Sequence, residues 1–204
     1  MRRAAGKAGR GIPLLLAALM PVTAAASSDG TTNLAPNPGF ETADANNRLL
    51  PEGWCTFSIG ADCDIRLYSR ESLEGTRSLR INMIPRVGAV QGVVASLPVE
   101  PKTRYDFSVS AKRARDVLSS AAGYFKLVVE WLDEHSGEIT RKESAPVALG
   151  SLSRKRWKRF ELRKLRVPRR AVTAKFSVQF FSTGPGRGVV LLDDVRIAAT
   201  WKGR

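Results

Sequence analysis

Short segments in which apolar and polar residues alternate constrain this chain more than any other feature of its sequence. Tyr105–Ala111 and Phe125–Trp131 both carry apolar residues at every second position. Because successive side chains of an extended chain point to opposite faces, such a segment is typical of a β-strand with one buried face. Turns containing Gly and Pro separate the segments, and no stretch keeps a helical period. The pattern predicts an all-β fold in which two antiparallel sheets pack as a sandwich.

The alternation also predicts where the strands lie. We expect strands at 64–68, 78–84, 87–97, 105–111, 124–132, 138–142, 157–167, 171–182 and 189–197. Asp133–Gly137 is predicted to be a hairpin turn. The strand at 157–167 is predicted to be irregular around Lys164, and residues 114–120 are predicted to form a loop.

The first 26 residues have the three parts of a secretory signal peptide. Four Lys and Arg residues within the first ten positions precede a short apolar run, Ile12–Val22, and small residues follow at 23–26. The alternative is a membrane anchor, but the apolar run is too short to span a bilayer. We therefore expect a signal peptide at 1–26, a disordered new N-terminus at 27–32 and one domain at 33–200. The mature protein is expected to be secreted or periplasmic.

The sequence holds two cysteines, Cys55 and Cys63. In an exported protein, such a closely spaced pair is expected to form a local disulfide, which would staple the loop between them. Two free thiols are the alternative, which an oxidising compartment disfavours. A zinc site has little support, because only two cysteines are present and the sole histidine lies far away in the chain.

Motifs for catalysis are missing from the sequence. The sole histidine, His135, falls in the predicted hairpin turn, where a solvated residue is expected rather than a general base. No nucleophile elbow, phosphate-binding loop or dinucleotide fingerprint occurs. A glycosidase needs two carboxylates across a cleft, whereas Asp133, Glu134 and Glu138 gather in and beside one turn. We therefore expect a protein that is not an enzyme.

The two ends of the predicted domain each carry an acidic residue beside apolar ones. Asn33–Glu41 bends through Asn-Pro-Gly and closes on Glu41. Near the other end, strand alternation places Asp193 on the same face as Val195 and Ile197, which we expect to be the core face. A buried carboxylate needs a partner, and a second carboxylate would repel it unless a hard cation lies between them. The alternative is that both carboxylates accept hydrogen bonds from backbone amides.

Seven motifs occur in a fixed order along nearly the whole domain. They are NLAPNPGFE at 33–41, LLPEGW at 49–54, EGTRSLRIN at 74–82, YDFSVSAKR at 105–113, LVVEWLDEHSG at 127–137, RWKRFEL at 156–162 and VVLLDDVRI at 189–197. This ordered set resembles the carbohydrate-binding modules of families 4, 9 and 22 and the wider galactose-binding-like jelly rolls. The resemblance implies a jelly-roll sandwich that binds a glycan chain on the concave face of one sheet.

The resemblance also implies functional residues. Glu41 and Asp193 stand where family residues help to bind a structural Ca²⁺, with backbone carbonyls around Gly75–Ser78 completing the oxygen shell. Outward polar and aromatic side chains of the predicted strands are the candidates for contact with a glycan: Gln91, Ser110, Lys112, Tyr124, Lys126, Glu130, Gln179 and Phe181. With only two outward aromatic residues in this set, we expect a cleft for a single soluble chain rather than a platform for a crystalline polysaccharide. An ordinary solvated sheet face is the alternative.

A run of basic residues at 154–170 suggests a second kind of partner. Ten of these 17 residues are Lys or Arg, in a chain whose formal net charge is +14. An anionic polysaccharide or a cell-envelope surface would match this charge, so the alternative function is a structural or adhesion module. The competing explanation is a solvated strand edge whose charges prevent edge-to-edge pairing. Nucleic acid is not expected as the partner, because aromatic residues for stacking are sparse near the run.

Overall fold

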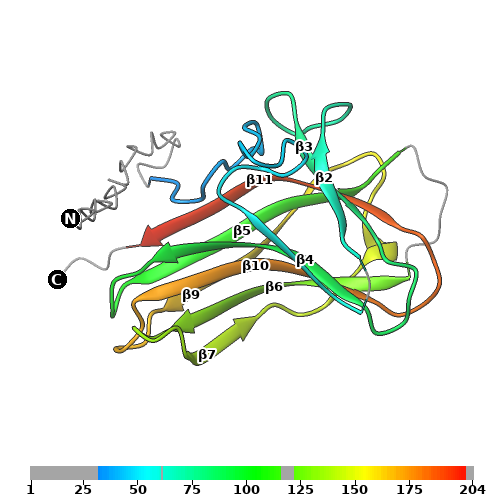
Figure 1. Ribbon diagram of the computed structural model, residues 1–204. Coiled ribbons are helices and arrows are strands. Elements are labelled where there is room, and N and C mark those ends of the chain that lie inside the picture. Colours follow the sequence, from blue (N-terminus) through cyan, green and yellow to red (C-terminus); the bar gives the residue numbers. More distant parts are fainter. Residues whose placement is uncertain (1–31, 61, 116–121, 201–204) are drawn as a thin grey trace, which may run out of the picture.

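The computed structural model describes residues 32–60, 62–115 and 122–200. The predicted signal peptide, nearly all of the predicted N-terminal segment 27–32 and most of the predicted loop at 114–120 lie outside these residues. The described part is a sandwich of two antiparallel sheets, as the alternation predicts (Figure 1). No helix within it has the length and apolar character that a membrane crossing requires.

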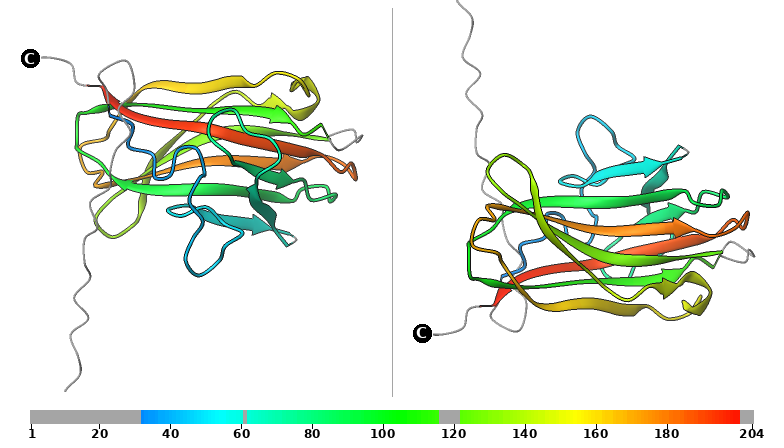
Figure 2. Two further views of the ribbon diagram at one scale, coloured as in Figure 1. Left: turned by 90° about the horizontal axis from the view of Figure 1, so that it is seen from above. Right: turned by 90° about the horizontal axis from the view of Figure 1, so that it is seen from below.

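Two sheets of unequal size form the layers, which Figure 2 shows along their edges. The six-stranded sheet has the order β1 (Cys55–Ile59), β4 (Val90–Pro98), β10 (Thr173–Ser182), β6 (Gly123–Leu132) and β7 (Glu138–Glu143), with β8 (Val147–Ala148) also paired to β6. The five-stranded sheet has the order β2 (Asp64–Tyr68), β3 (Ser78–Asn82), β11 (Val189–Thr200), β5 (Arg104–Arg113) and β9 (Lys158–Arg166). A single 3₁₀ turn, η1 (Leu149–Ser151), follows β8. All nine predicted strands are confirmed, with ends shifted by at most three residues.

The core lies between the sheets and is rich in aromatic side chains. Phe107 of β5 packs edge-on against Phe176 of β10, with the ring centroids 5.5 Å apart. Trp131 of β6 lies 6.3 Å from Phe176 in a similar orientation. All three side chains are almost completely buried. The Phe107–Phe176 contact joins the two sheets, and the Trp131–Phe176 contact lies within the six-stranded sheet. Since aromatic side chains bury large apolar areas, such contacts stabilise the sandwich.

The structure corrects the prediction for the cysteines. Cys55 and Cys63 are free thiols, so the predicted disulfide is absent. Cys55 is exposed and begins β1 of the six-stranded sheet, whereas Cys63 packs against the core just before β2 of the five-stranded sheet. The segment expected to be one stapled loop is therefore an extended strand that carries the chain about 13 Å away from Cys55 before it turns to the other sheet.

A β-bulge changes the predicted alternation near the C-terminal end of the domain. On β11, Asp193 pairs with Ser110 and Arg196 pairs with Ser108, so β11 has one residue more than β5 at this point. Asp194 has a left-handed backbone, with φ 47°. Because of the extra residue, Val195 and Ile197 face the core while Asp193 faces outward. Asp193 is completely buried, as predicted, but beneath a surface loop and not among the core side chains.

The basic run at 154–170 lies along one edge of the five-stranded sheet. Most of it belongs to β9, which ends the five-stranded sheet. Phe160 and Leu165 face the core, and the Lys and Arg side chains of β9 are exposed. Lys164 has φ 55°, and the register with β5 shifts nearby, which confirms the predicted irregularity. The arrangement agrees with the explanation that charges blunt a strand edge.

Candidate functional site

Five of the eight residues proposed for glycan contact lie on one open face. Tyr124, Lys126 and Glu130 are on β6, and Gln179 and Phe181 are on the neighbouring β10. Tyr124 is paired with Phe181, and Lys126 with Gln179. Paired residues of antiparallel strands project to the same side, and their neighbours Phe125 and Phe180 face the core. The five side chains therefore share the outer face of the six-stranded sheet.

The aromatic pair on this face borders a hollow. The rings of Tyr124 and Phe181 are stacked, with centroids 4.8 Å apart and planes 12° from parallel. A hollow of about 310 Å³ lies between this pair and the loop that carries Val87, Gly88 and Ala89. Val87 is 69% exposed. The hollow is therefore lined by aromatic and aliphatic surface, with the Ser182–Thr183 segment beside it.

A third aromatic side chain, which the sequence analysis did not propose, reaches the same face. Phe57 of β1 is paired with Gly92 of β4. A Cβ atom on Gly92 would lie 2.8 Å from the Phe57 ring, so the ring lies directly over this glycine. The alternation in Cys55–Ile59 could have revealed the strand, but the segment was expected to be a disulfide loop. The open face thus carries three aromatic residues.

The two charged residues of the candidate set on this face form ion pairs with the edge strand β7. Lys126 Nζ lies 2.8 Å from Glu143 Oε2, and Glu130 Oε1 lies 3.5 Å from an Arg141 nitrogen. The hydrogen bond to Glu143 raises the pKa of Lys126 above its usual value. Lys126 also lies over the Phe181 ring, 5.8 Å from its centroid. The aromatic surface is therefore flanked by charged groups of both signs.

Three of the proposed contact residues do not belong to this face. Gln91 lies on β4 with its side chain directed into the interior, where it is 1% exposed and donates a hydrogen bond to the Asn82 carbonyl (2.8 Å). Ser110 and Lys112 are on β5 of the other sheet. Lys112 is 1% exposed and is paired with Glu71. The structure therefore does not bring these three residues to the open face of the six-stranded sheet.

On the opposite side of the molecule, a loop at 71–78 covers part of the five-stranded sheet and is held by two carboxylates. Asp193 accepts hydrogen bonds from the amides of Leu73 (2.6 Å) and Glu74 (3.3 Å). Glu41 accepts hydrogen bonds from the amides of Thr76 and Arg77, both at 2.9 Å. The loop is thus fastened to both ends of the domain.

The surroundings shift the pKa of the two carboxylates in opposite directions. Burial raises the pKa of Asp193 to about 6, even though backbone amides donate hydrogen bonds to it. Burial alone would also raise the pKa of Glu41, but the hydrogen bonds from Thr76 and Arg77 outweigh it and hold the pKa below its usual value. Hydrogen bonds to a charged carboxylate favour that form, and desolvation opposes it.

The donor groups around these carboxylates bear on the predicted calcium site. Glu41 Oε1 and Asp193 Oδ1 lie 3.8 and 3.9 Å from the Cβ position that Gly39 lacks, so the two oxygens are at most 7.7 Å apart. Carboxylate oxygens are among the hard ligands that Ca²⁺ takes. The hydrogen bonds that Glu41 and Asp193 accept from backbone amides are those expected under the alternative without a metal. No group of three or more His, Cys, Asp or Glu side chains gathers as a metal site in the described ranges, and calcium stays a prediction.

Comparison with known proteins identifies the fold. No known protein family and no curated protein sequence matches the chain. Most of the matching solved structures are β-sandwich carbohydrate-binding modules. The xylan-binding family 22 module of Paenibacillus barcinonensis has a TM-score of 0.55 and 15% identity, over 81% of this chain and 93% of that one.

Enzymes share the same architecture. The enzymatically active domain of tailspike protein 4 from bacteriophage CBA120 has a TM-score of 0.62 and 15% identity, over 82% of this chain. The match spans only 21% of the tailspike chain. A Stig cyclase from Fischerella has a TM-score of 0.58 and 15% identity, over 84% of this chain and 98% of the cyclase. At these identities the likeness concerns the fold, which hosts several activities.

Proposed function

We propose that the chain is an exported, non-catalytic module that binds a glycan chain on the outer face of the six-stranded sheet. The observation that carries the proposal is the gathering of Phe57, Tyr124 and Phe181 on one open face, beside the hollow next to Val87. Sites for small ligands combine apolar and aromatic surface with a few placed polar groups. This face offers both.

The polar groups give the face a means of orienting hydroxyl groups. Lys126 supplies donors, Glu130 supplies acceptors, and Gln179 supplies both. Lys126 and Glu130 already pair with β7 residues, so a glycan would share these partners rather than meet unpaired charges. The modules named for xylan and for β-1,4-galactotriose support a β-linked neutral polysaccharide as the first ligand to test.

The lack of a catalytic role is supported by the position of the sole histidine. His135 lies at the tip of the β6–β7 turn, where its side chain is 86% exposed. Its backbone amide donates to Asp133 Oδ1 at 3.0 Å, which makes the residue part of the turn. Export rests on the signal-like N-terminal segment of the sequence.

The test is affinity electrophoresis of residues 33–200 in gels containing xylan or β-1,4-galactan. The wild type should be retarded, and Phe181→Ala should lower the association constant about tenfold, as expected for an aromatic contact at the centre of a site. Leu49→Ala is the matched control, because Leu49 is a 62% exposed apolar residue of the 43–50 loop. Absence of retardation, or equal losses in the two variants, would refute the proposal.

A further inference from the structure

A second groove lies on the outer face of the five-stranded sheet, between β9 and β11. Two hollows, of about 500 and 290 Å³, follow the outer face of β5 and share Thr200 as a lining residue. Ser108 and Ala198 line the second hollow and have small side chains. The loop 99–103 borders the first hollow and is joined by hydrogen bonds to the loop after β9, with Val167 N donating to Thr103 O at 2.9 Å. The groove is therefore built on a fixed backbone.

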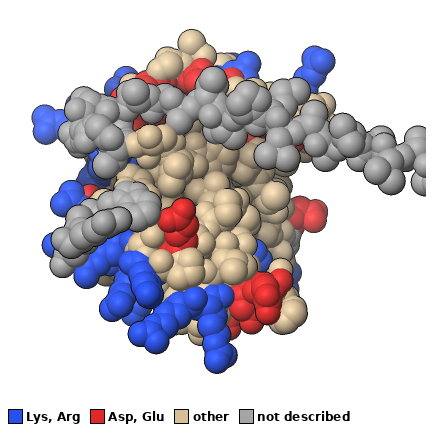
Figure 3. Space-filling view, turned by 90° about the vertical axis from the view of Figure 1, so that its left-hand side faces the viewer, with Lys and Arg blue, Asp and Glu red and all other residues tan. Residues whose placement is uncertain are grey.

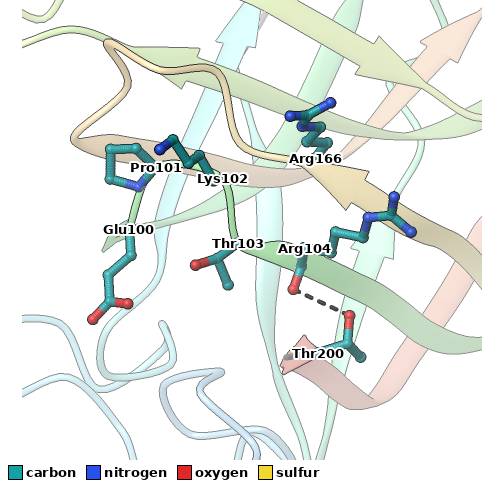
Figure 4. A pocket seen from close by; sticks show the side chains of 7 residues that line it. All are labelled: Glu100, Pro101, Lys102, Thr103, Arg104, Arg166 and Thr200. Carbon is teal, nitrogen blue, oxygen red and sulfur yellow. Dashed lines mark hydrogen bonds between the residues drawn. The ribbon is translucent and has the colours of Figure 1, made fainter. Parts of the chain in front are cut away.

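Positive side chains stand opposite one another in the first hollow. Arg104 of β5 is directly paired with Arg166 of β9, and Lys102 lies in the adjoining loop (Figure 4). Like charges directly opposite each other on neighbouring strands are destabilising. No ion pair with any other described residue is found for these three side chains. In Figure 4, Glu100 extends away from them. An anion bound here would offset the repulsion.

The second hollow also carries positive side chains, but two of them are in ion pairs. Arg159, Arg163 and Arg196 line it, together with Asp106 and Glu161. Arg163 pairs with Glu161 at 2.8 Å, and Arg159 pairs with Asp194. Across both hollows the lining holds six Lys and Arg residues and three acidic ones. Figure 3 looks onto the end of the sandwich where β11 ends, and it shows Lys and Arg gathered on one side of that end. The lining of the groove therefore carries an excess of positive charge, most of it in the first hollow, and Ser108 and Ala198 contribute small side chains to the second.

We propose that this groove binds a linear acidic polysaccharide, with carboxylate or sulfate groups spaced along the chain. The planar guanidinium of Arg matches such groups in a bidentate manner. From Arg104 to Ser108, the β5 residues that line the groove, the strand extends about 13 Å, which gives room for a short stretch of the polysaccharide. The Thr200 hydroxyl donates to the Arg104 carbonyl at 3.2 Å and can accept a hydrogen bond from the same polysaccharide chain, and the Ser108 hydroxyl can donate one. The groove displays no exposed aromatic ring, which disfavours nucleic acid, since single strands bind by stacking.

The inference does not depend on the proposed neutral glycan site, because the two surfaces belong to opposite sheets. A variant of one surface should leave the other unaffected. Phe181→Ala should keep its affinity for acidic polysaccharide, and a groove variant should keep its affinity for xylan. Failure of either proposal can thus be recognised separately.

The test compares two double variants of residues 33–200 that lose the same charge. Arg104→Gln/Arg166→Gln removes the facing pair, and Arg48→Gln/Lys142→Gln removes two exposed cations outside the groove. Binding to heparin, to polygalacturonate and to a single-stranded DNA of similar charge is measured by calorimetry at about 50 mM salt, where screening is modest. The groove variant should lose about tenfold or more in affinity for at least one of the two acidic polysaccharides, and the control about threefold or less.

The melting temperature of the groove variant should not fall, because the substitution removes a repulsion. The sulfated and carboxylated probes show which anionic group the groove prefers. Equal losses in the two double variants would mean that charge alone attracts the polysaccharide and would overturn the proposal. So would a wild type that binds neither acidic polysaccharide, or DNA that binds as tightly and depends on Arg104 and Arg166 to the same extent.

Discussion

The two outer faces of the sandwich differ in how far other parts of the chain cover them. Lys126 on β6 and Lys112 on β5 both point outward from long central strands, yet their side chains are 24% and 1% exposed. Lys126 stays accessible because the face around it remains open. Lys112 is enclosed by the segment that carries Glu71 and by Trp157, whose ring centroid lies 5.6 Å from Lys112 Nζ. An outward position on a strand is therefore available to a ligand only where no loop of the same chain covers it.

The largest expected effect on stability comes from a substitution in the loop at 71–78, which covers part of the outer face of the five-stranded sheet. Gly75 has φ 62°, and a Cβ atom there would overlap the Glu41 carboxylate. Gly75→Ala should lower the free energy of unfolding by about 3 kcal/mol, from left-handed strain and weakened hydrogen bonds to a charged group. Urea denaturation measures the change.

Gly150→Ala is the control for this substitution. The site has no atom within 4 Å of the added Cβ and no positive φ. The free energy of unfolding should stay within about 0.5 kcal/mol of the wild type. Equal losses in the two alanine variants would show that the loop is not held through Glu41.

Adding or removing calcium tests whether a bound ion holds the loop at 71–78 in addition to its amide hydrogen bonds with Glu41 and Asp193. We predict that Ca²⁺ binds between Glu41 and Asp193 and stabilises the fold by about 2.7 kcal/mol at a hundred times its Kd. A chelator should then lower the melting temperature of the wild type, and Asp193→Ala or Glu41→Gln should abolish that effect while glycan binding survives. Asp44→Ala, in the 43–50 loop, should keep the chelator effect. If neither calcium nor chelator changes the melting temperature, the calcium prediction is wrong, and the loop at 71–78 is held by the amide hydrogen bonds alone.

A smaller effect is expected on the open face. Gly92→Ala would bring a methyl group against the Val178 carbonyl and the Phe57 ring. We expect a loss of about 2 kcal/mol in the free energy of unfolding, as for other overpacked sites. The loss should shrink in a Phe57→Ala background, because one of the two overlaps is then gone. A double-mutant cycle measures this coupling, and a coupling of zero would show that the Phe57 ring does not lie over Gly92.

The sequence was a good guide to the strands and a weaker guide to the faces. Alternation in β5, β6 and β10 is clean, so their inward residues were predicted. In β4, apolar residues occupy both sides, with Val90 and Val94 opposite to Val93 and Ala95. The direction of Gln91 was therefore ambiguous and was assigned wrongly. Alternation separates inside from outside, but it contains no information about which sheet a strand joins.

Because alternation does not report which sheet a strand joins, the eight residues proposed for glycan contact do not all lie on one face. Ser110 and Lys112 were grouped with Tyr124 and Phe181 because all four point outward, but strand pairing places the two pairs on opposite sheets. Pairing depends on contacts between segments distant in the sequence, which no local pattern reports. Asp193 shows the same limit in another form, since a single extra residue in β11 reversed its direction.

The bulge in β11 acts as a phase shift in the strand. Up to Leu192, even-numbered residues face the core, and from Val195 onward odd-numbered residues do. A regular strand that kept all of these residues would turn Arg196 into the hydrocarbon interior and expel Ile197, whereas deleting Asp194 would leave Val195 and Ile197 facing the core. The extra residue therefore allows one odd-numbered and one even-numbered residue, Asp193 and Arg196, both to face outward. The acidic residue that holds the loop at 71–78 and an arginine of the groove both depend on this bulge.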